Sequence, residues 1–404
     1  MALEPLAPAV TMKARVKRIF QHAPEGVEAV VLANSEAPHL DFGFFYATDL
    51  VEGGLFEGGY AVLRPDGSLT ILTNELEEQS ARKAKDAEVL VFHGAEERKN
   101  LLQKAVGGAT RVGYHGREAT WAAVQAVQKA LPSVAWEDVS DAVLQARMVK
   151  DRIEVARIRK ACRISSQVAE EIPSMLREGM TEADLSAALN ARMQSLGAAG
   201  PSFSTIIAFG ANAAEPHYAP RAGVKLARNS YVLCDFGAQY QLYAADITRT
   251  FVFGKANAKQ REVYNLVKKA QQVGFDAVRP GVKAAEVHEK VAEVIERSKY
   301  KGRFIHSTGH SLGLSVHDGG RIAAGSTTVL EEGMVFTVEP GIYLPGWGGV
   351  RIEDDVLVTK RGCELLTTAG RAFVEVPLPA KGAKPSRPAA KARRGGKKAR
   401  KSRR

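Results

Sequence analysis

The sequence predicts two folded domains of different class, an α/β domain followed by an α+β domain. Two observations support this prediction. Up to about residue 146, short apolar runs alternate with helical stretches, which is the order expected of a layered α/β domain. Over residues 147–378, helices and antiparallel strands come in blocks, which is typical of an α+β domain. The 404 residues are 45% hydrophobic and 25% charged, enough apolar material for both cores.

The α/β domain is expected to span residues 1–146. Pro65-Asp66-Gly67 lies between two apolar runs and predicts a hairpin turn. Apolar residues at helical spacing predict a helix over 117–131. The expected strands occupy residues 27–34, 60–66, 69–73, 87–92 and 111–115.

The α+β domain, residues 147–378, begins with a charged segment in which apolar residues recur every three or four positions, so we expect a long helix over 146–176. Thr181 precedes two acidic residues and predicts the N-cap of a helix that ends near Leu196. Pro280-Gly281 separates two further helices. The remaining elements are expected to be helices at 257–278 and 283–298 and strands at 231–239, 241–254, 334–339, 350–358 and 372–377.

The formal net charge of +11 is concentrated at one end of the chain. Residues 381–404 hold twelve Lys or Arg and no acidic residue, so the rest of the chain carries a net charge of −1. We expect residues 379–404 to be a disordered basic tail. Such a tail can make weak polyanion or nucleic-acid contacts through counterion release, or serve only as a solvated extension. It contains no aromatic residue for base stacking.

Membrane insertion and disulfide bonding are not indicated. No segment reaches the roughly 18 consecutive apolar residues that span a bilayer, and the first twenty residues lack a cleavable apolar signal. A cytoplasmic location without membrane contact is therefore expected. The cysteines are three in number and far apart, which predicts reduced, mostly buried thiols.

Two aspartates on successive predicted strands are the first candidate metal ligands. If Tyr240-Gln241 forms the tip of the hairpin, Asp235 lies directly opposite Asp246 on one face of the sheet. Directly opposed Cβ atoms lie about 4.5–5.5 Å apart, which suits two carboxylates around metal ions about 3.5–4 Å apart. Two acidic side chains on a solvent-exposed face are the alternative, and the apolar neighbours on both strands disfavour it.

Histidines provide the next candidates. His310 lies between Gly309 and Gly313, which permit close backbone approach, although a single histidine in such a place is more often structural. His317 follows seven residues later, so the two imidazoles would point to opposite faces of a continuous strand. A turn between them, or approach of His317 from another side of the pocket, is required.

Two glutamates complete the set. Glu339 follows an alternating strand and precedes a Pro-Gly pair, which places its carboxylate at a strand end. Glu353 shares a strand face with Arg351 and Asp355 by two-residue alternation. A surface ion pair between Arg351 and Glu353, and ligation by Asp355 in place of Glu353, are both open alternatives at this point.

Five short segments of the chain carry these candidates, in the order CDFG, ADITRTF, GHSLGLSVHD, TVEPGIY and RIEDD. In this order and spacing they resemble the five metal-ligand segments of the metallopeptidase family that includes methionine aminopeptidase, Xaa-Pro aminopeptidase and prolidase. The resemblance covers about residues 150–370 and implies the pita-bread fold. The N-terminal domain resembles the creatinase/prolidase-type domain of the proline-directed branch, which methionine aminopeptidases generally lack. The ligands that the resemblance implies for two metal ions are Asp235, Asp246, His310, Glu339 and Glu353.

The resemblance also implies supporting residues around the metals. His217, His306, His317 and Arg351 match positions that contact substrate or support the ligands in the Xaa-Pro aminopeptidase branch. Thr248 and Thr337 each lie two residues from a ligand and are further candidates for this supporting role.

A set of carboxylates with one imidazole suits Mn²⁺, Co²⁺, Fe²⁺ or Zn²⁺. Of these, Mn²⁺ is the metal that we expect first. Two such ions would give a bridging hydroxide as nucleophile and polarise the scissile carbonyl. Glu339 is the candidate to carry the proton from the attacking water to the leaving amine. His217 and His317 would donate hydrogen bonds to the substrate carbonyl and the oxyanion, and Arg351 would orient an acidic partner or hold the substrate.

The expected function is hydrolysis of the bond between an N-terminal residue and proline, as an aminopeptidase or as a dipeptidase. Its partners would be peptides with proline at the second position, and the resemblance implies a homodimer. A metal-free creatinase-like C–N hydrolase and a non-catalytic binding module that uses the basic tail for polyanions are the alternatives. Retention of all five ligand residues argues against both.

Overall fold

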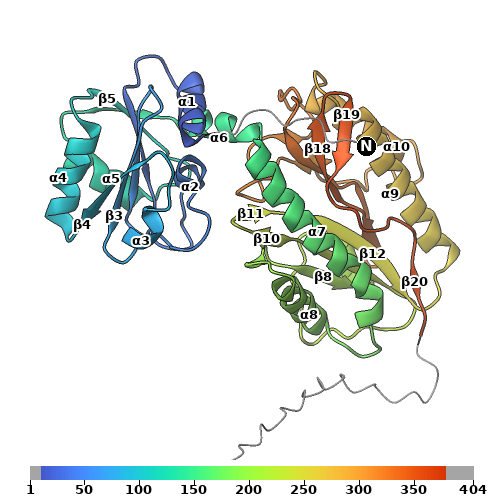
Figure 1. Cartoon of the computed structure of the whole chain (residues 1–404). Helices are drawn as coiled ribbons and strands as arrows, with labels where there is room; N and C mark the ends of the chain where they lie inside the picture. The colour runs from blue at the N-terminus through green and yellow to red at the C-terminus, as the bar shows by residue number, and fades with distance from the viewer. Residues whose placement is uncertain (1–10, 379–404) are drawn as a thin grey trace, which may run out of the picture.

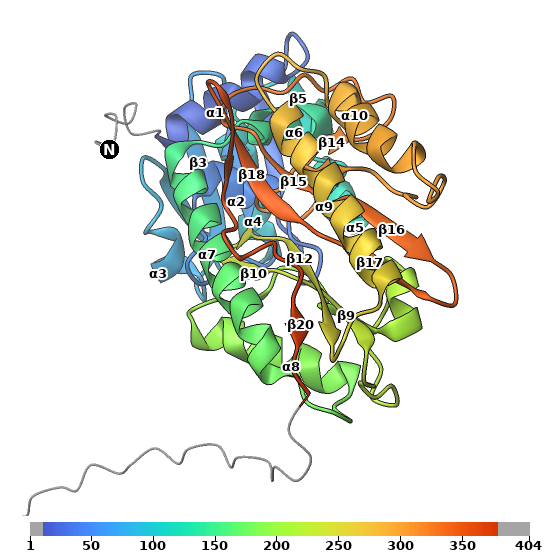
Figure 2. The ribbon, with the colours of Figure 1, turned by 90° about the vertical axis from the view of Figure 1, so that its right-hand side faces the viewer.

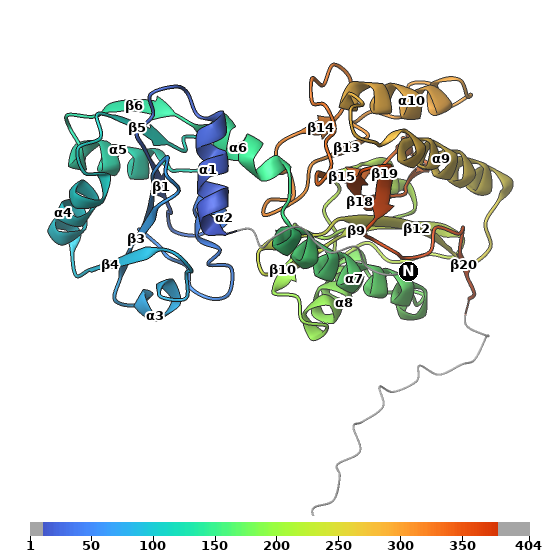
Figure 3. The same cartoon turned by 45° about the horizontal axis from the view of Figure 1, so that its top comes forward.

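A computed structural model describes residues 11–378 of the chain. An N-terminal domain built on one six-stranded sheet lies beside a C-terminal domain of helices and several smaller sheets (Figure 1). Helix α6 (Ser140–Met148) leads from the first domain to the second, as Figure 3 shows. The expected basic tail, residues 379–404, lies outside the described residues. Within residues 11–378, no helix is long and apolar enough to cross a membrane.

The N-terminal sheet has the strand order β4-β3-β2-β1-β5-β6, in which β2 is antiparallel to both of its neighbours and the other pairs are parallel. All five predicted strands form, and Gly67, with a φ of +92°, lies in the predicted turn between β2 and β3. Strand β6 and the helices α1 to α4 were not predicted from the sequence. The elements are α1 (Met12–His22), β1 (Ala29–Ala33), α2 (Phe42–Thr48), β2 (Tyr60–Leu63), β3 (Leu69–Asn74), α3 (Glu78–Ala81), β4 (Glu88–Phe92), α4 (Ala95–Val106), β5 (Arg111–Tyr114), α5 (Trp121–Ala130) and β6 (Ala135–Asp138).

Both faces of this sheet are covered by helices. Val30 and Leu32 pack into a core shared with α1, α2 and α6, whereas Ala29 and Val31 point into a second core with α4 and α5. Strands buried on both faces are apolar at successive positions rather than at alternate ones. The apolar runs were therefore visible in the sequence.

The C-terminal domain consists of two helix-and-sheet halves, the pita-bread arrangement that the resemblance implied. Helices α7 and α8 pack on the sheet β20-β12-β9-β8, and α9 packs against β15 and β19 of the sheet β15-β18-β19. Figure 2 shows α7 and α9 in front of the strands that they cover. The helices are α7 (Arg152–Met175), α8 (Glu182–Ser195), α9 (Ala258–Ala277) and α10 (Ala284–Glu296).

Short strands make up the rest of this domain. The predicted strand over 372–377 is wrong in length, because only β20 (Glu375–Val376) forms there. The other strands are β7 (Gly200–Pro201), β8 (Ile206–Phe209), β9 (Ser230–Phe236), β10 (Ala238–Tyr240), β11 (Tyr243–Ala244), β12 (Ile247–Phe253), β13 (Gly309–His310), β14 (Arg321–Ile322), β15 (Val335–Val338), β16 (Gly341–Leu344), β17 (Gly348–Arg351), β18 (Asp354–Thr359) and β19 (Gly362–Leu365). The 3₁₀ helix η1 spans Gly210–Ala214.

The predicted single helix over 146–176 is wrong. The chain leaves the helical path after Met148, because the Lys150 N–H donates to the Gly333 carbonyl at 2.9 Å and an isolated bridge pairs the preceding residue with the same loop. Asp151 then starts α7 with a capping box that includes Glu154. The contacts with the loop leave no local signal in the sequence, whereas the Asp151/Glu154 capping-box spacing does mark a helix start within the predicted helix.

Candidate metal centre

Asp235 and Asp246 come from the hairpin that joins β9 to β12. Its tip is Gln241-Leu242, with φ of +49° and +62°, and the predicted tip at Tyr240-Gln241 is wrong. Asp235 therefore pairs with Thr248, not with Asp246. Because Asp246 and Thr248 are two residues apart, both carboxylates still project from the same face of the hairpin. Neither tip residue is of the Asn, Asp or Gly type that marks such turns.

Strand β13 brings His310 to this hairpin. A Cβ atom on Gly309 would lie 1.9 Å from the Thr337 carbonyl oxygen, so only glycine allows β13 to approach β15 this closely. The backbone N–H of His310 donates to Thr337 Oγ1 at 3.1 Å. His310 Nε2 then lies 3.6 Å from Asp246 Oδ2 and 3.6 Å from Glu339 Oε1.

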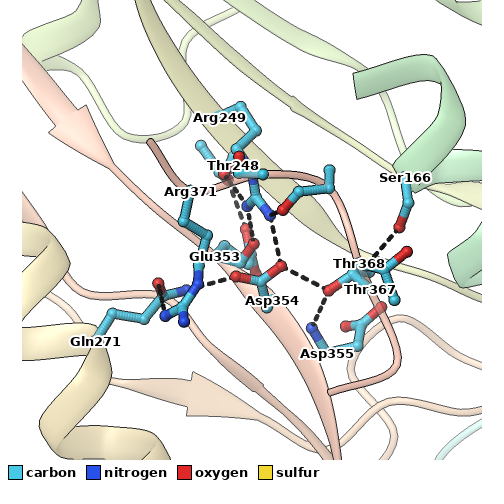
Figure 4. Close-up of polar contacts among 12 residues, drawn as sticks. Ser166, Thr248, Arg249, Gln271, Glu353, Asp354, Asp355, Thr367, Thr368 and Arg371 are labelled. Carbon is cyan, nitrogen blue, oxygen red and sulfur yellow. Dashed lines mark hydrogen bonds and ion pairs between the residues drawn. The ribbon is translucent and has the colours of Figure 1, made fainter. Parts of the chain in front are cut away.

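Glu353 lies at a break between two strands. The predicted continuous strand over 350–358 is wrong, since β17 ends at Arg351 and β18 begins at Asp354. The guanidinium of Arg249 holds the break by donating to the Glu353 carbonyl oxygen at 2.6 Å and to Asp354 Oδ1 at 2.7 Å (Figure 4). The Thr248 hydroxyl donates to Glu353 Oε2 at 2.5 Å, which ties this carboxylate to the hairpin.

Asp355, the rival ligand, has a different environment from Glu353. Its Oδ2 accepts the backbone N–H of Asp246 at 2.9 Å and the Cys162 thiol at 3.2 Å. It therefore lies behind the backbone of Asp246, where it supports the position of that residue. Cys162 and Cys234 are buried free thiols, as expected.

Ligand-type atoms of Asp246, His310 and Glu353 all lie within 4.8 Å of one another. Glu339 adjoins them through its contact with His310. Asp235 is held by Arg351, whose Nη2 donates to Asp235 Oδ2. The structure thus gathers the five residues from four separate segments of the chain into one cluster, in which Glu339 is partly exposed and the other four are buried.

The charges in this cluster are not balanced by the protein. Burial, reinforced by Glu353 and Asp235, raises the pKa of Asp246 well above its usual range, and burial with Glu339 does the same to the pKa of Glu353. Burial lowers the pKa of His310 to about 3, which leaves its imidazole neutral and able to ligate a metal. Within residues 11–378, Oδ1 of Asp235 and Oδ1 of Asp246 have no hydrogen-bond partner. A divalent cation would satisfy both the charge and these atoms, so the residues fit a metal site.

Arg351, Tyr343 and His306 form a hydrogen-bonded chain beside the cluster. Arg351 Nη1 donates to the Tyr343 hydroxyl oxygen at 2.9 Å, and this hydroxyl lies 2.8 Å from His306 Nε2. Arg351 Nε also donates to Thr248 Oγ1 at 3.0 Å. Tyr343 was not among the candidates from the sequence. In the sequence it is marked by its place at the end of the segment TVEPGIY, four residues after Glu339.

His317 reaches the cluster because the chain reverses between it and His310. The Asp318 N–H donates to the Ser311 carbonyl oxygen at 2.8 Å, which closes the turn that the seven-residue spacing required. The ring centroids of His310 and His317 are 4.3 Å apart. Burial and the positive charge of Arg321, with a smaller contribution from nearby His217, lower the pKa of His317. The side chains of His217 and His317 are both exposed, unlike that of His310.

A pita-bread domain with carboxylates and an imidazole grouped between its sheets belongs to the class of metal-dependent hydrolases. Residues 156–360 match the model of the family described as metallopeptidase family M24, and residues 26–149 match that of the creatinase/prolidase N-terminal domain. The chain belongs to metallopeptidase family M24. Its N-terminal domain places it in the Xaa-Pro aminopeptidase/prolidase branch, as the resemblance of that domain indicated.

Similar proteins cover almost the whole chain. The Xaa-Pro dipeptidase of Pyrococcus horikoshii is 33% identical over 364 residues, which is 90% of this chain and 99% of that protein. The solved structure of an Xaa-Pro dipeptidase from Bacillus anthracis has a TM-score of 0.83 at 30% identity and covers 90% of this chain and 100% of that one. The X-Pro aminopeptidase structure from Thermotoga maritima has a TM-score of 0.80 at 31% identity, with 86% and 98% covered.

Proposed function

We propose that this chain hydrolyses the peptide bond between an N-terminal residue and proline with the help of two divalent cations. The observation that carries the proposal is the convergence of Asp246, His310 and Glu353, whose ligand-type atoms lie within 4.8 Å of one another, next to Glu339 and Asp235. The Xaa-Pro dipeptidases that match nearly the full chain support the substrate class. They also favour dipeptidase over aminopeptidase activity.

The cations would be held by Asp235, Asp246, His310, Glu339 and Glu353. Four carboxylates and one imidazole are predominantly hard donors, so Mn²⁺ is the first candidate, with Co²⁺, Fe²⁺ and Zn²⁺ as the others. When bound, such ions polarise the scissile carbonyl and lower the pKa of the attacking water. Without cations, the buried carboxylates of Asp246 and Glu353 are destabilised by burial and by neighbouring negative charges, which supports occupancy of the cluster by cations.

Glu339 is the residue that we propose for proton transfer. Its side chain is 14% exposed, compared with 11% for Asp235 and 7% for Asp246, so it is the most accessible of these three carboxylates. From this position it would accept a proton from the attacking water and deliver it to the leaving amine. The Thr337 hydroxyl, 3.4 Å from Glu339 Oε1, would hold the carboxylate in place.

The histidines and Arg351 would contact the substrate or orient the metal ligands. His317 has an exposed side chain beside His310, and His217, also exposed, follows Pro216, whose carbonyl oxygen accepts from Arg351 Nη2 at 3.5 Å. Both histidines would donate hydrogen bonds to the substrate carbonyl and the oxyanion. Arg351 is buried and already engaged with Asp235, Thr248 and Tyr343, which supports a role in orienting ligands over one in holding substrate. His306 extends this chain of contacts through Tyr343.

The test uses the full chain, dialysed against a chelator and reloaded separately with Mn²⁺, Co²⁺ and Zn²⁺. Each form is assayed on Ala-Pro and Gly-Pro dipeptides, on Xaa-Pro-Yaa tripeptides and on Met-Ala peptides. We expect metal-dependent hydrolysis of the Xaa-Pro dipeptides and none of Met-Ala. Failure to cleave any Xaa-Pro bond with every metal, or equal rates on Met-Ala, would contradict the proposal.

The same preparation addresses the remaining expectations. A homodimer, implied by the resemblance, predicts a mass near twice 43.6 kDa in sedimentation, and a monomer would contradict it. Undiminished hydrolysis by chelated protein would favour the metal-free C–N hydrolase alternative in place of a metallopeptidase mechanism.

A further inference from the structure

A second cluster of buried charged side chains lies between the two domains. On the N-terminal side, His115 Nδ1 is 2.7 Å from Asp41 Oδ1 and 3.7 Å from Glu118 Oε2. Glu118 Oε1 accepts a hydrogen bond from Arg147 Nη1 at 3.0 Å. Arg147 is near the end of α6, the helix that leads into the C-terminal domain.

The cluster continues into the segment that carries two of the metal-centre histidines. Arg147 Nη2 donates to Asp318 Oδ1, and Lys150 Nζ lies 3.3 Å from Asp318 Oδ2. Lys150 Nζ also donates to Ser311 Oγ at 3.3 Å. Residues from the junction between the domains therefore hold both ends of the turn 311–318, which begins directly after His310.

The charges of this interdomain cluster balance when His115 is protonated. Three carboxylates, those of Asp41, Glu118 and Asp318, then meet three cations, those of His115, Arg147 and Lys150. The ligand-type atoms of Asp41, His115 and Glu118 are close enough to hold a metal. Arg147 already supplies positive charge to Glu118, however, so the arrangement is that of a buried ion-pair network.

Asp318 and His317 are adjacent but have opposite environments. The Asp318 side chain is 1% exposed and lies against Gly313, where a Cβ atom would be 2.1 Å from Asp318 Oδ2. The His317 side chain is exposed, and no hydrogen bond to its ring exists within residues 11–378. Apart from its ring contact with His310, the position of His317 therefore depends on the backbone that Asp318 fixes.

We propose that Asp318, clamped by Arg147 and Lys150, is a positioning residue that holds His317 at the metal centre and makes this placement depend on the N-terminal domain. The proposal rests on the proposed function of His317 as a hydrogen-bond donor to the substrate. Displacing a catalytic group by about 1 Å can cost about 10²-fold in rate. Loss of the clamp should therefore act on turnover more than on substrate binding.

The test compares Asp318→Asn with Lys150→Met, a milder variant that keeps Arg147 in place should Asp318→Asn fail to fold. With an Xaa-Pro dipeptide as substrate, we expect kcat to fall roughly 10-fold in Asp318→Asn and roughly 3-fold in Lys150→Met, with KM within about 2-fold. In a His317→Ala background, both substitutions should cost almost nothing further in kcat, because they act through the same side chain. Equal losses in both backgrounds would overturn the proposal.

Asp151→Asn is the matched control. Asp151 is also buried, also at the domain junction and also paired with an arginine, Arg15 at 2.7 Å, but it does not contact the turn 311–318. Asparagine keeps its N-cap role. We expect kcat within about 2-fold of wild type, and a loss as large as that of Asp318→Asn would show that general weakening of the junction is responsible.

A spectroscopic measurement separates this proposal from the proposed function. The ring signals of ¹³C-labelled histidine are assigned by loss of the His317 signal in His317→Ala. Asp318→Asn should shift the His317 signal, whereas Asp151→Asn should not, whether or not the chain proves to be a peptidase. An unchanged His317 signal in a folded Asp318→Asn variant would overturn the positioning role even if Xaa-Pro hydrolysis is found.

Discussion

Two buried clusters in this chain place a histidine among carboxylates at metal-ligand distances, and they differ in how their charges are compensated. Around His310, four carboxylates meet one guanidinium, that of Arg351. Around His115, three carboxylates meet Arg147, Lys150 and the imidazole itself. The first cluster has an excess of negative charge, and the second has none once its histidine is protonated.

This difference teaches that distance alone does not identify a metal site. Both clusters satisfy the same distance criterion, and within residues 11–378 both contain oxygen atoms without a hydrogen-bond partner, such as Asp246 Oδ1 and Asp41 Oδ2. An uncompensated set of buried carboxylates requires a cation, whereas a compensated set is a structural ion-pair network. Four predictions follow this contrast from the largest expected effect to the smallest.

The largest effect is expected on activity. Glu353→Gln should lower kcat/KM for Ala-Pro by at least about 10³-fold, because removing a ligand forfeits several kcal/mol of metal-assisted catalysis. Steady-state assays with saturating Mn²⁺ and metal analysis of the dialysed protein provide the measurement. Glu364→Gln, which changes a partly exposed glutamate paired with Arg159, is the control and should keep wild-type activity. Wild-type turnover by folded, metal-replete Glu353→Gln would refute the ligand assignment.

Stability should change in opposite directions in the two clusters. Asp318→Asn leaves buried Arg147 with less compensation and should lower the free energy of unfolding by about 3–5 kcal/mol. In metal-free protein, Asp246→Asn should raise it by about 1–4 kcal/mol, the size of one charge repulsion at about 4 Å for dielectric constants from that of water down to about 20. Urea unfolding in the presence of a chelator measures both. If both variants changed the free energy of unfolding in the same direction, the proposed difference in charge compensation between the two clusters would be contradicted.

The pH dependence of stability should report on His115. Burial would lower the pKa of His115, but the carboxylates of Asp41 and Glu118 outweigh burial and the charge of Arg147, so the pKa lies above the usual 6.5. Its contribution is therefore complete below pH 6.5 and is lost as the pH rises through the folded-state pKa, with a slope of at most about 1.4 kcal/mol per pH unit.

This dependence is measured by urea unfolding between pH 6 and pH 9 on wild type and His115→Gln. The variant should lack the decline that wild type shows on the alkaline side. His22→Gln, which removes another histidine of the same domain at the exposed end of α1, should behave as wild type. A parallel decline in all three proteins would mean that His115 is not the group responsible.

The smallest effect is expected on metal content. His115→Gln should bind as many metal ions per chain as wild type, because its cluster is compensated by cationic side chains. His310→Ala should bind fewer. Metal analysis after equilibrium dialysis gives both numbers. Loss of one ion from folded His115→Gln would make the interdomain cluster a metal site and remove the distinction drawn above.

The sequence indicated the five candidate ligands through ligand-type side chains in short segments flanked by glycine or by an alternating strand, and the family resemblance selected Glu353 over Asp355. It did not predict how the segments meet. The hairpin tip at Gln241-Leu242 has no turn-forming residue, so Asp235 was paired with the wrong partner. The strand break at Glu353 depends on Arg249, which lies 104 residues earlier.

The supporting contacts were harder still to predict. Tyr343 reaches His306 and Arg351 only after β16 pairs with β17. Arg147 meets Asp318 across 171 residues, and each looks like an ordinary charged residue in the sequence. Propensity and periodicity describe a few turns of chain, whereas these contacts arise when whole sheets and domains pack together.

The hairpin between β9 and β12 also limits how the chain can change in length. Asp235 and Asp246 share a face because an even number of residues separates Asp246 from the partner of Asp235. Insertion or deletion of one residue within the paired strands between them would turn one carboxylate to the opposite face of the sheet, whereas a change of two would preserve the arrangement. A change at the tip alters only the length of the loop and keeps both carboxylates on one face, so grafts of different length belong at Gln241-Leu242.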